Sequence, residues 1–284
     1  PGRADALLLL GAAHYQRGEY DACLHANAEA IRAEPRFAEA HSNLANALKA
    51  LGDVDGAHAS YLKAIQLKPG FVDAHNNLAA LYMTSGQPHQ AEALLRRVVA
   101  LHPDRPDAHL HLGNACKARG DAAGAERAFS TAVQLRPAYA PAWAALGALA
   151  RESGNVVSAA SYYERAVELD PGLAEAVSNL GNVYKDMGRA DEAIGCYRRA
   201  IALQPGLAVA HGNLAGALCD AGRLDEAIAA YRRAIALEPR FADAYNNLGN
   251  ALKETGRLDE AIESYHAALR IHQHHHHAYN NLGN

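Results

Sequence analysis

The sequence predicts an all-α protein, a solenoid of helix-turn-helix repeats, each 34 residues long. Three rows of residues with this spacing carry the prediction: a proline, a glycine and a leucine. The prolines are Pro35, Pro69, Pro103, Pro137, Pro171, Pro205 and Pro239. The glycines are Gly18, Gly52, Gly86, Gly120, Gly154, Gly188, Gly222 and Gly256. The leucines are Leu10, Leu44, Leu78, Leu112, Leu146, Leu180, Leu214, Leu248 and Leu282.

Each repeat is expected to contain two antiparallel helices of about 14 residues. Glycine permits the tight turn between the helices, and proline stops the second helix before the next repeat begins. Position 8 is always Gly or Ala and position 20 is nearly always Ala, so the helices can approach closely. A larger side chain at these positions would overpack the pair.

Numbering each repeat so that the proline is position 32 defines a single solenoid over residues 1–284. The complete repeats are expected at 4–37, 38–71, 72–105, 106–139, 140–173, 174–207, 208–241 and 242–275, with a truncated ninth at 276–284.

One repeat matches a known signature residue by residue. Its matching residues are Trp143, Leu146, Gly147, Ala159, Tyr163 and Pro171. At this spacing the repeat resembles the tetratricopeptide family. The resemblance implies that neighbouring repeats stack into a right-handed superhelix whose first helices line the inside. Function is therefore expected on that inner, concave face.

Composition argues against several classes of partner. The 27 Lys and Arg residues are balanced by 31 Asp and Glu residues, a net charge of −4, so neither nucleic acid nor a membrane surface is expected as a partner. The four cysteines lack the spacing of a disulfide framework or a zinc site. A reducing compartment fits this pattern best.

Asparagines recur on one face of the first helices. At 100° per residue, positions 2, 6, 9 and 13 share the open face, opposite the packed side. Position 6 is Asn43, Asn77, Asn179, Asn213, Asn247 and Asn281. Position 9 adds Asn46, Asn114, Asn182, Asn250 and Asn284.

Two interpretations of these asparagines stay open. Asparagine is a middling helix former whose amide competes for backbone hydrogen bonds, so its repetition needs a reason. In one interpretation the amides bond to each other and keep the groove polar. In the other, their donors and acceptor match the C=O and N–H of an extended peptide backbone. With helices about 8–10 Å apart, one asparagine would meet about every third peptide residue.

Charged rows accompany the asparagines. Position 2 carries Glu39, Asp73, Asp107, Glu175 and Asp243. These acids either stabilise the first turn of each helix or select basic or hydroxyl-bearing client side chains. The basic residues at position 12, such as Arg151 and Lys185, are interpreted mainly as structural, since a cation suits the end of a helix.

A narrower resemblance follows from recurring phrases. The phrase from Asn247 to Lys253, preceded by Phe241–Tyr245, looks like the amino-terminal half of protein O-GlcNAc transferases. The first repeat, with Glu19–Cys23 and Asn27, is similar to the plant-type subfamily known as SECRET AGENT. The resemblance implies an arm that recruits extended segments of client proteins in the cytoplasm and nucleus. Its asparagine ladder would bind the client backbone, and lumen aspartates would influence substrate choice.

The same resemblance implies a separate catalytic domain that transfers N-acetylglucosamine from UDP-GlcNAc to Ser or Thr. Within this chain we expect no catalytic residue and no cofactor. Because it starts at Pro1 and stops at Asn284 inside a helical pattern, we expect a piece of a longer protein. The ladder is interrupted at His111 and Ala145, where backbone binding should weaken.

Several alternatives remain. The repeats would equally suit a SPINDLY-type protein O-fucosyltransferase or a non-enzymatic interaction scaffold, and homo-oligomers are possible. The histidines at 272 and 274–277 are expected to form a solvated junction and not a metal site, because contiguous histidines lack helical i, i+4 pairing. The histidines at position 4 are expected to be packing residues, and the paired arginines of the second helices to face solvent.

Overall fold

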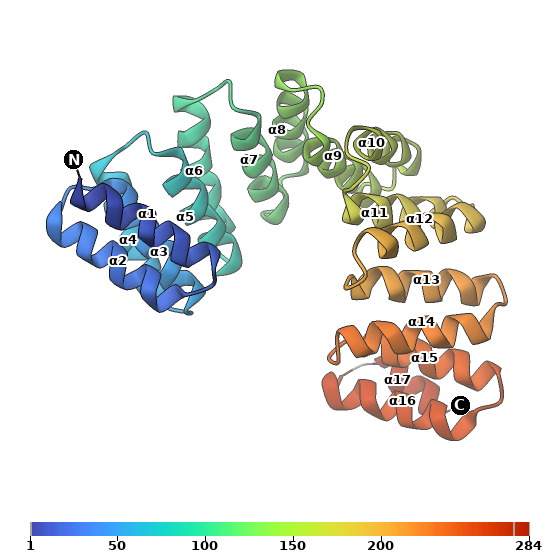
Figure 1. The fold of residues 1–284 in the computed structure, drawn as a ribbon. Coiled ribbons are helices and arrows are strands. Elements are labelled where there is room, and N and C mark those ends of the chain that lie inside the picture. Colours follow the sequence, from blue (N-terminus) through green and yellow to red (C-terminus); the bar gives the residue numbers. More distant parts are fainter. Residues whose placement is uncertain (1, 275, 284) are drawn as a thin grey trace. The chain divides into compact units, whose positions relative to one another are not determined.

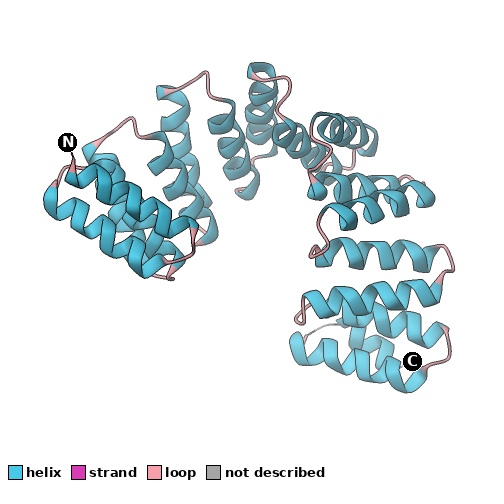
Figure 2. Ribbon diagram, viewed as in Figure 1, coloured by secondary structure: helices cyan, strands magenta, loops and turns pink. Residues whose placement is uncertain are grey.

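The computed structural model describes residues 2–274 and 276–283, and within them every regular element is an α-helix (Figures 1 and 2). Pro1, His275 and Asn284 lie outside the described residues. The prediction of an all-α repeat protein is confirmed. The chain divides into two compact units, Pro1–Pro137 and Ala138–Asn284, and each is described here by itself.

Helices alternate along both units in pairs, and each pair corresponds to one 34-residue period. The first unit contains α1 (Arg3–Gln16), α2 (Tyr20–Ala33), α3 (Ala38–Ala50), α4 (Val54–Leu67), α5 (Val72–Thr84), α6 (Pro88–Leu101), α7 (Pro106–Ala118) and α8 (Ala122–Leu135). The second contains α9 (Ala140–Glu152), α10 (Val156–Leu169), α11 (Ala174–Asp186), α12 (Ala190–Leu203), α13 (Ala208–Asp220), α14 (Leu224–Leu237), α15 (Ala242–Glu254), α16 (Leu258–Ile271) and α17 (His276–Gly283).

The periodic glycines make the turn inside each pair. All eight have positive φ, from Gly86 and Gly222 at 71° to Gly52 at 88°. Side chains other than glycine rarely adopt this left-handed conformation, so the glycine ends the first helix. In three pairs the second helix is also capped, because Asp53, Asp121 and Asn155 each accept a hydrogen bond from the backbone N–H three residues later.

The helices of a pair touch where position 8 meets the large residue at position 24. A Cβ added to Gly113 would lie 2.3 Å from Cε1 of Phe129, and one added to Gly249 would lie 2.5 Å from Cε1 of Tyr265. Phe129 is completely buried. The missing side chain therefore leaves the space that the aromatic ring fills, as expected for a close helix approach.

Histidines at position 4 join three of the first helices to the junctions before them. Their Nε2 atoms lie within hydrogen-bonding distance of the proline carbonyl six residues earlier: His41 to Pro35 O at 3.2 Å, His109 to Pro103 O at 2.9 Å and His211 to Pro205 O at 3.2 Å. These are structural contacts, in agreement with a packing role.

His75 is the most buried member of this row and makes a different contact. Its ring is 1% exposed, Nδ1 lies 2.8 Å from the carbonyl oxygen of Phe71, and Nε2 is buried without a partner. Burial lowers the pKa of His75, the contact with Phe71 opposes this, and the nearby charges of Arg97 and His102 lower it further. The neutral imidazole is therefore the form that the fold accommodates.

We expect this histidine to make the first unit less stable in mild acid. Because the pKa of His75 is lower in the folded state, the unfolded chain binds more protons as the pH falls. Its contribution is fully present above the ordinary imidazole pKa of about 6.5 and is lost below it. Urea unfolding measures the free energy of unfolding of wild type and of His75→Tyr at pH 7.5 and 5.5. This free energy should fall less in the variant between the two pH values. Tyrosine is chosen because Tyr245 occupies the same position in another repeat. Equal losses in both proteins would contradict the assignment.

In the part of the chain that the structure describes, no helix combines the length and the apolar character needed to cross a membrane.

Candidate functional site

The asparagine rows are joined by a repeated three-residue hydrogen-bonded group, which we call the triad. In the first unit, Oδ1 of Asn46 on α3 accepts a hydrogen bond from the hydroxyl of Tyr61 on α4, at 2.5 Å. The same oxygen accepts from Nδ2 of Asn77 on α5, at 3.1 Å. One position-9 asparagine therefore links both helices of its own repeat to the first helix of the next.

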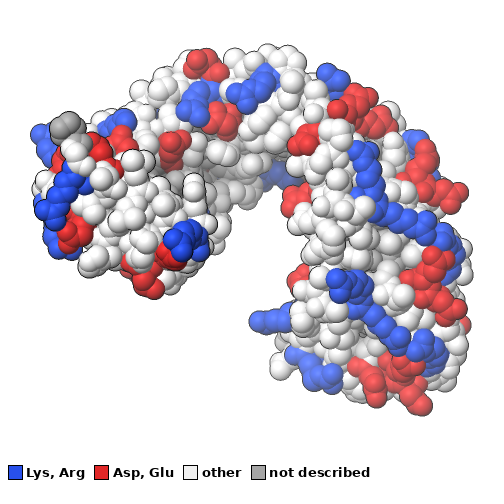
Figure 3. Space-filling view, viewed as in Figure 1, with Lys and Arg blue, Asp and Glu red and all other residues white. Residues whose placement is uncertain are grey.

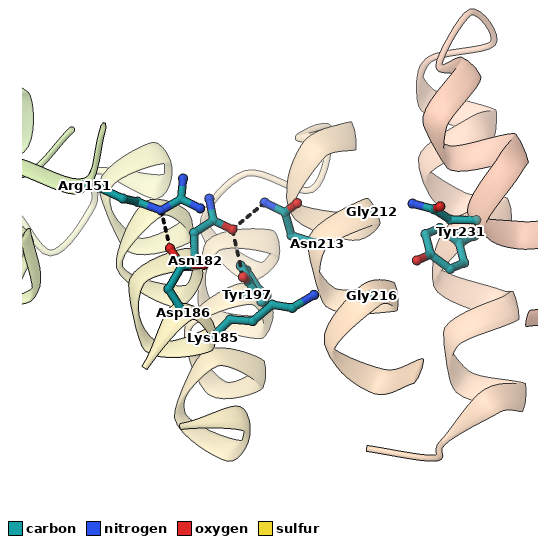
Figure 4. A pocket seen from close by; sticks show the side chains of 10 residues that line it. Arg151, Asn182, Lys185, Asp186, Tyr197, Gly212, Asn213, Gly216 and Tyr231 are labelled. Carbon is teal, nitrogen blue, oxygen red and sulfur yellow. Dashed lines mark hydrogen bonds and ion pairs between the residues drawn. The ribbon is translucent and has the colours of Figure 1, made fainter. Parts of the chain in front are cut away.

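The second unit contains the same triad twice. Asn182 accepts from the hydroxyl of Tyr197 at 2.8 Å and from Nδ2 of Asn213 at 3.0 Å, and Figure 4 shows both bonds converging on one oxygen. Asn250 accepts in the same way from Tyr265 and from Asn281, both at 2.9 Å. The triad thus recurs at equivalent positions of three repeats.

The tyrosine hydroxyl of each triad is protonated and can therefore donate its hydrogen bond to the position-9 amide. Tyr61, Tyr197 and Tyr265 are each no more than 2% exposed. Burial raises the pKa of each of these phenols. The hydroxyl therefore stays protonated at neutral pH and fixes the orientation of the position-9 amide.

The triad uses only part of each amide. The position-9 oxygen receives two donors, and its Nδ2 group takes no part in the triad. In the position-6 partner, Asn77 or Asn213, one N–H is used. Among the described residues, no protein group donates a hydrogen bond to the Oδ1 of these two asparagines. Amide-to-amide bonding and backbone binding are thus compatible, because a triad retains both donors and an acceptor.

Not every predicted asparagine belongs to a triad. Asn43 and Asn179 follow repeats that carry alanine at position 9, Ala12 and Ala148. Both are partly buried, and Asn179 accepts a long contact from Nδ2 of Asn182 at 3.4 Å. Asn43 and Asn179 therefore occupy the predicted face without the link between repeats.

Two further asparagines differ from the pattern for separate reasons. Asn114 is exposed, and its repeat has Phe129 where the triads have tyrosine, so no hydroxyl is present. Asn247 follows Gly216, lines the same hollow as Tyr231 and accepts from Nδ2 of Asn246 at 3.1 Å. This junction therefore has no position-9 amide that could join the two residues.

The tyrosine was not predicted as part of the site. A signal existed in the sequence, because Asn46, Asn182 and Asn250 all belong to repeats with tyrosine fifteen residues later and are followed by an asparagine 31 residues later. Asn114 has neither partner. The simultaneous presence of all three residues distinguishes a triad from an isolated asparagine.

The position-2 acids fall into two groups. Glu39 is paired with Lys68 at 2.6 Å and Asp107 with Arg105 at 2.7 Å. Hydrogen bonds from these cations lower the pKa of both carboxyls. The other acids, Asp73, Glu175 and Asp243, are exposed, and Asp243 borders a hollow that includes Asn247, Asn250 and Asn281. These three carboxyl groups are therefore accessible to solvent.

Basic residues at position 12 pair with acids of the following repeat. Arg151 Nε lies 2.7 Å from Asp186, and Lys185 Nζ lies 3.0 Å from Asp220. Arg151, Lys185 and Asp186 border a polar hollow of about 270 Å³ beside Gly216 (Figure 4). These contacts agree with a mainly structural role for the row.

One group of potential metal ligands occurs among the described residues, and its chemistry does not suit a metal ion. Glu92, Cys116 and Asp121 have ligand atoms within 4.8 Å of one another. The buried carboxylate of Glu92 is already paired with Arg96 and Arg119, each at 2.8 Å. Two guanidinium groups supply the positive charge there, so a cation would have to displace them.

The described part of the histidine cluster is divided between two elements. His272 follows α16 as its C-cap, whereas His276 and His277 begin α17. On the face shown in Figure 3, basic and acidic side chains are interspersed. Two of the paired arginines of the second helices form ion pairs, Arg198 with Glu226 at 3.4 Å and Arg232 with Glu260 at 2.7 Å.

Comparison with known proteins identifies a relative of the kind that the sequence phrases suggested. Over 61 residues the chain is 52% identical to the probable UDP-N-acetylglucosamine–peptide N-acetylglucosaminyltransferase SEC of Arabidopsis thaliana. The alignment covers 22% of this chain and 6% of that protein, so the chain matches only a small part of the relative. The chain is thus a tetratricopeptide region with local similarity to an O-GlcNAc transferase.

Solved structures and family models agree on the fold. The crystal structure of the APC/C hetero-tetramer Cut9–Hcn1 aligns with a TM-score of 0.74 and 18% identity, covering 99% of this chain and 55% of that one. Residues 213–276 match a family described as tetratricopeptide repeat. Residues 38–241 match the family described as cilia and flagella-associated protein 70 C-terminal domain. Since that match covers more than half of the chain, the protein belongs to this family of tetratricopeptide-repeat proteins.

Proposed function

We propose that this chain is the client-recruiting arm of a protein O-GlcNAc transferase and that its triads bind the backbone of extended client segments. The observation that carries the proposal is the recurrence of the triad in three repeats, two of which, those of Asn77 and Asn213, leave a donor and an acceptor of the position-6 amide unused. An extended peptide presents one C=O and one N–H per residue, so these groups suit any client sequence.

The internal bonds of the triad favour binding by holding the amides in place. Ordering a free side chain at an interface costs about 0.5–1.5 kcal/mol. In the triad, Tyr197 and Asn182 already restrict each other before a client arrives. The hydroxyl therefore acts as a support for the binding amides, in the manner of an outer residue that orients a binding group.

Local similarity to the Arabidopsis enzyme supports the transferase part of the proposal. On this proposal, a catalytic domain outside these residues uses UDP-GlcNAc to modify Ser or Thr of the recruited client in the cytoplasm and nucleus. A SPINDLY-type O-fucosyltransferase or a scaffold would use the same backbone-binding triads, which we call the clamp. The 61-residue similarity is what favours the N-acetylglucosaminyltransferase.

The clamp is tested with a peptide whose small side chains offer few specific contacts, so that binding depends mainly on its backbone. We expect a fluorescein-labelled 15-residue peptide of Ser, Thr and Ala to bind, and N-methylation of every third amide to weaken it. Replacing Asn213 and Asn281 together by alanine should weaken binding by roughly tenfold or more, since each lost hydrogen bond contributes about 0.5–1.5 kcal/mol. Fluorescence anisotropy measures both effects.

A matched control separates the clamp from general damage. Arg233 is exposed on the second helix α14, so Arg233→Ala should leave peptide binding unchanged. Thermal unfolding by circular dichroism checks that the asparagine variant remains folded. Equal affinity of wild type and the asparagine variant, or indifference to N-methylation, would overturn the clamp.

A further inference from the structure

One junction of the first unit replaces all three members of the triad. Where the triad has asparagine, tyrosine and asparagine, this junction has Ala80 on α5, Leu95 on α6 and His111 on α7. The replacement opens a hollow of about 400 Å³ bordered by these residues. An apolar cavity of about 150 Å³ holds a benzene molecule, so there is room here for one aliphatic or aromatic side chain.

The surface that this hollow exposes is mainly apolar, although several of its lining residues are polar, and none of them carries a formal charge. Its residues are Asn76, Asn77, Ala79, Ala80, Met83, Thr84, Leu95, His111 and Asn114. The hydroxyl of Thr84 donates a hydrogen bond to the carbonyl oxygen of Leu81, at 3.0 Å. Burial lowers the pKa of His111, so its imidazole is neutral at pH 7. An ionised client side chain would find no opposite charge among these residues.

The hollow is continuous with the asparagine rows. Asn77, on its rim, belongs to the triad of Asn46, and the exposed Asn114 also borders it. Successive first helices lie about 8–10 Å apart, a distance that an extended chain covers in roughly three residues. A backbone held at Asn77 therefore brings a side chain of the following residues to the hollow.

We propose that this hollow is a specificity pocket that receives one bulky apolar side chain, Leu, Met or Phe, of the bound client segment. The proposal rests on the proposed function, because the triads hold the backbone that positions this side chain. Clients would then be segments with an apolar residue at a defined place, and the triads would tolerate any sequence elsewhere.

The test uses peptides that differ at a single residue. In the 15-residue Ser, Thr and Ala host, a central Leu or Phe should bind roughly tenfold or more tightly than a central Ser, because apolar groups in an apolar pocket discriminate by this amount. Ala80→Trp should fill the pocket and abolish the preference. Arg233→Trp, at the exposed position of α14 that served as the control above, should retain it. Equal affinities in wild type, or a preference that survives Ala80→Trp, would overturn the pocket.

A second measurement needs no change in the pocket. The chain has two methionines, Met83 in the hollow and Met187 at the end of α11, so ¹³C-methyl labelling gives two NMR signals. Met187→Leu assigns them. The Leu peptide should shift the Met83 signal and leave that of Met187 unchanged. A shift of Met83 with the Leu peptide but no binding of the Ser host would retain the pocket and reject the backbone clamp. Binding of the Ser host with no shift of Met83 by any peptide would reject the pocket alone.

Discussion

Replacing Phe129 by alanine should destabilise the first unit by about 3–5 kcal/mol, the usual range for a buried Phe→Ala change. Phe129 is completely buried and lies against Gly113, which has no side chain to occupy the cavity. The free energy of unfolding, measured in urea by circular dichroism, reports the loss.

A milder variant at the same site serves as the control. Phe129→Leu should cost clearly less, because Leu95 occupies the equivalent position of the preceding repeat and is itself buried. Since each repeat contacts only its neighbours, the loss should be concentrated in the helices around α8, which hydrogen exchange would reveal. A loss below about 1 kcal/mol in Phe129→Ala would show that the repeats collapse to fill the space.

Gly113→Ala should destabilise the same unit by about 1–3 kcal/mol through overpacking. The added Cβ would lie 2.3 and 2.5 Å from two carbons of the Phe129 ring, which is closer than atoms can approach. Alanine is the better helix former by about 1 kcal/mol, so a loss would mean that the clash outweighs this gain. Urea unfolding of the variant measures the balance.

Gly216 provides the matched comparison. A Cβ there would meet only Lys185 Nζ at 3.4 Å and the Tyr231 hydroxyl at 3.6 Å, so Gly216→Ala should be neutral or stabilising by up to about 1 kcal/mol. Combining Gly113→Ala with Phe129→Leu reproduces the Ala79 and Leu95 pair and should recover stability. Destabilisation of equal size at Gly113 and Gly216 would contradict the packing explanation.

The helix pairs could be predicted because their causes are local. A glycine such as Gly86, with φ of 71°, ends a helix through its own backbone, and a proline stops one by lacking an N–H. The shared face of Asn46 and Asn182 also follows from 100° per residue alone. These features need no knowledge of how one repeat packs on the next.

The triad and the pocket could not be predicted in the same way. The hydroxyl of Tyr61 reaches Asn46 only because α3 and α4 pack in one register, and Asn77 joins only when α5 stacks on α3. The interruption at His111 was predicted as a weakened clamp. Recognition of a hollow required Leu95, which lies on a second helix and shares no helix face with His111.

The vacancy at Gly216 has a consequence for how such a chain changes over generations. Tyr231 and Asn247 already stand where two members of a triad belong, and the Cβ of the missing third would make only ordinary contacts with Lys185 Nζ and the Tyr231 hydroxyl. On the proposed function, Gly216→Asn would therefore complete a triad at this junction and strengthen client binding without a change of the fold. On the proposed function, the number of complete triads determines how many junctions hold a client. A pocket such as the one at Ala80 arises where a junction loses its triad.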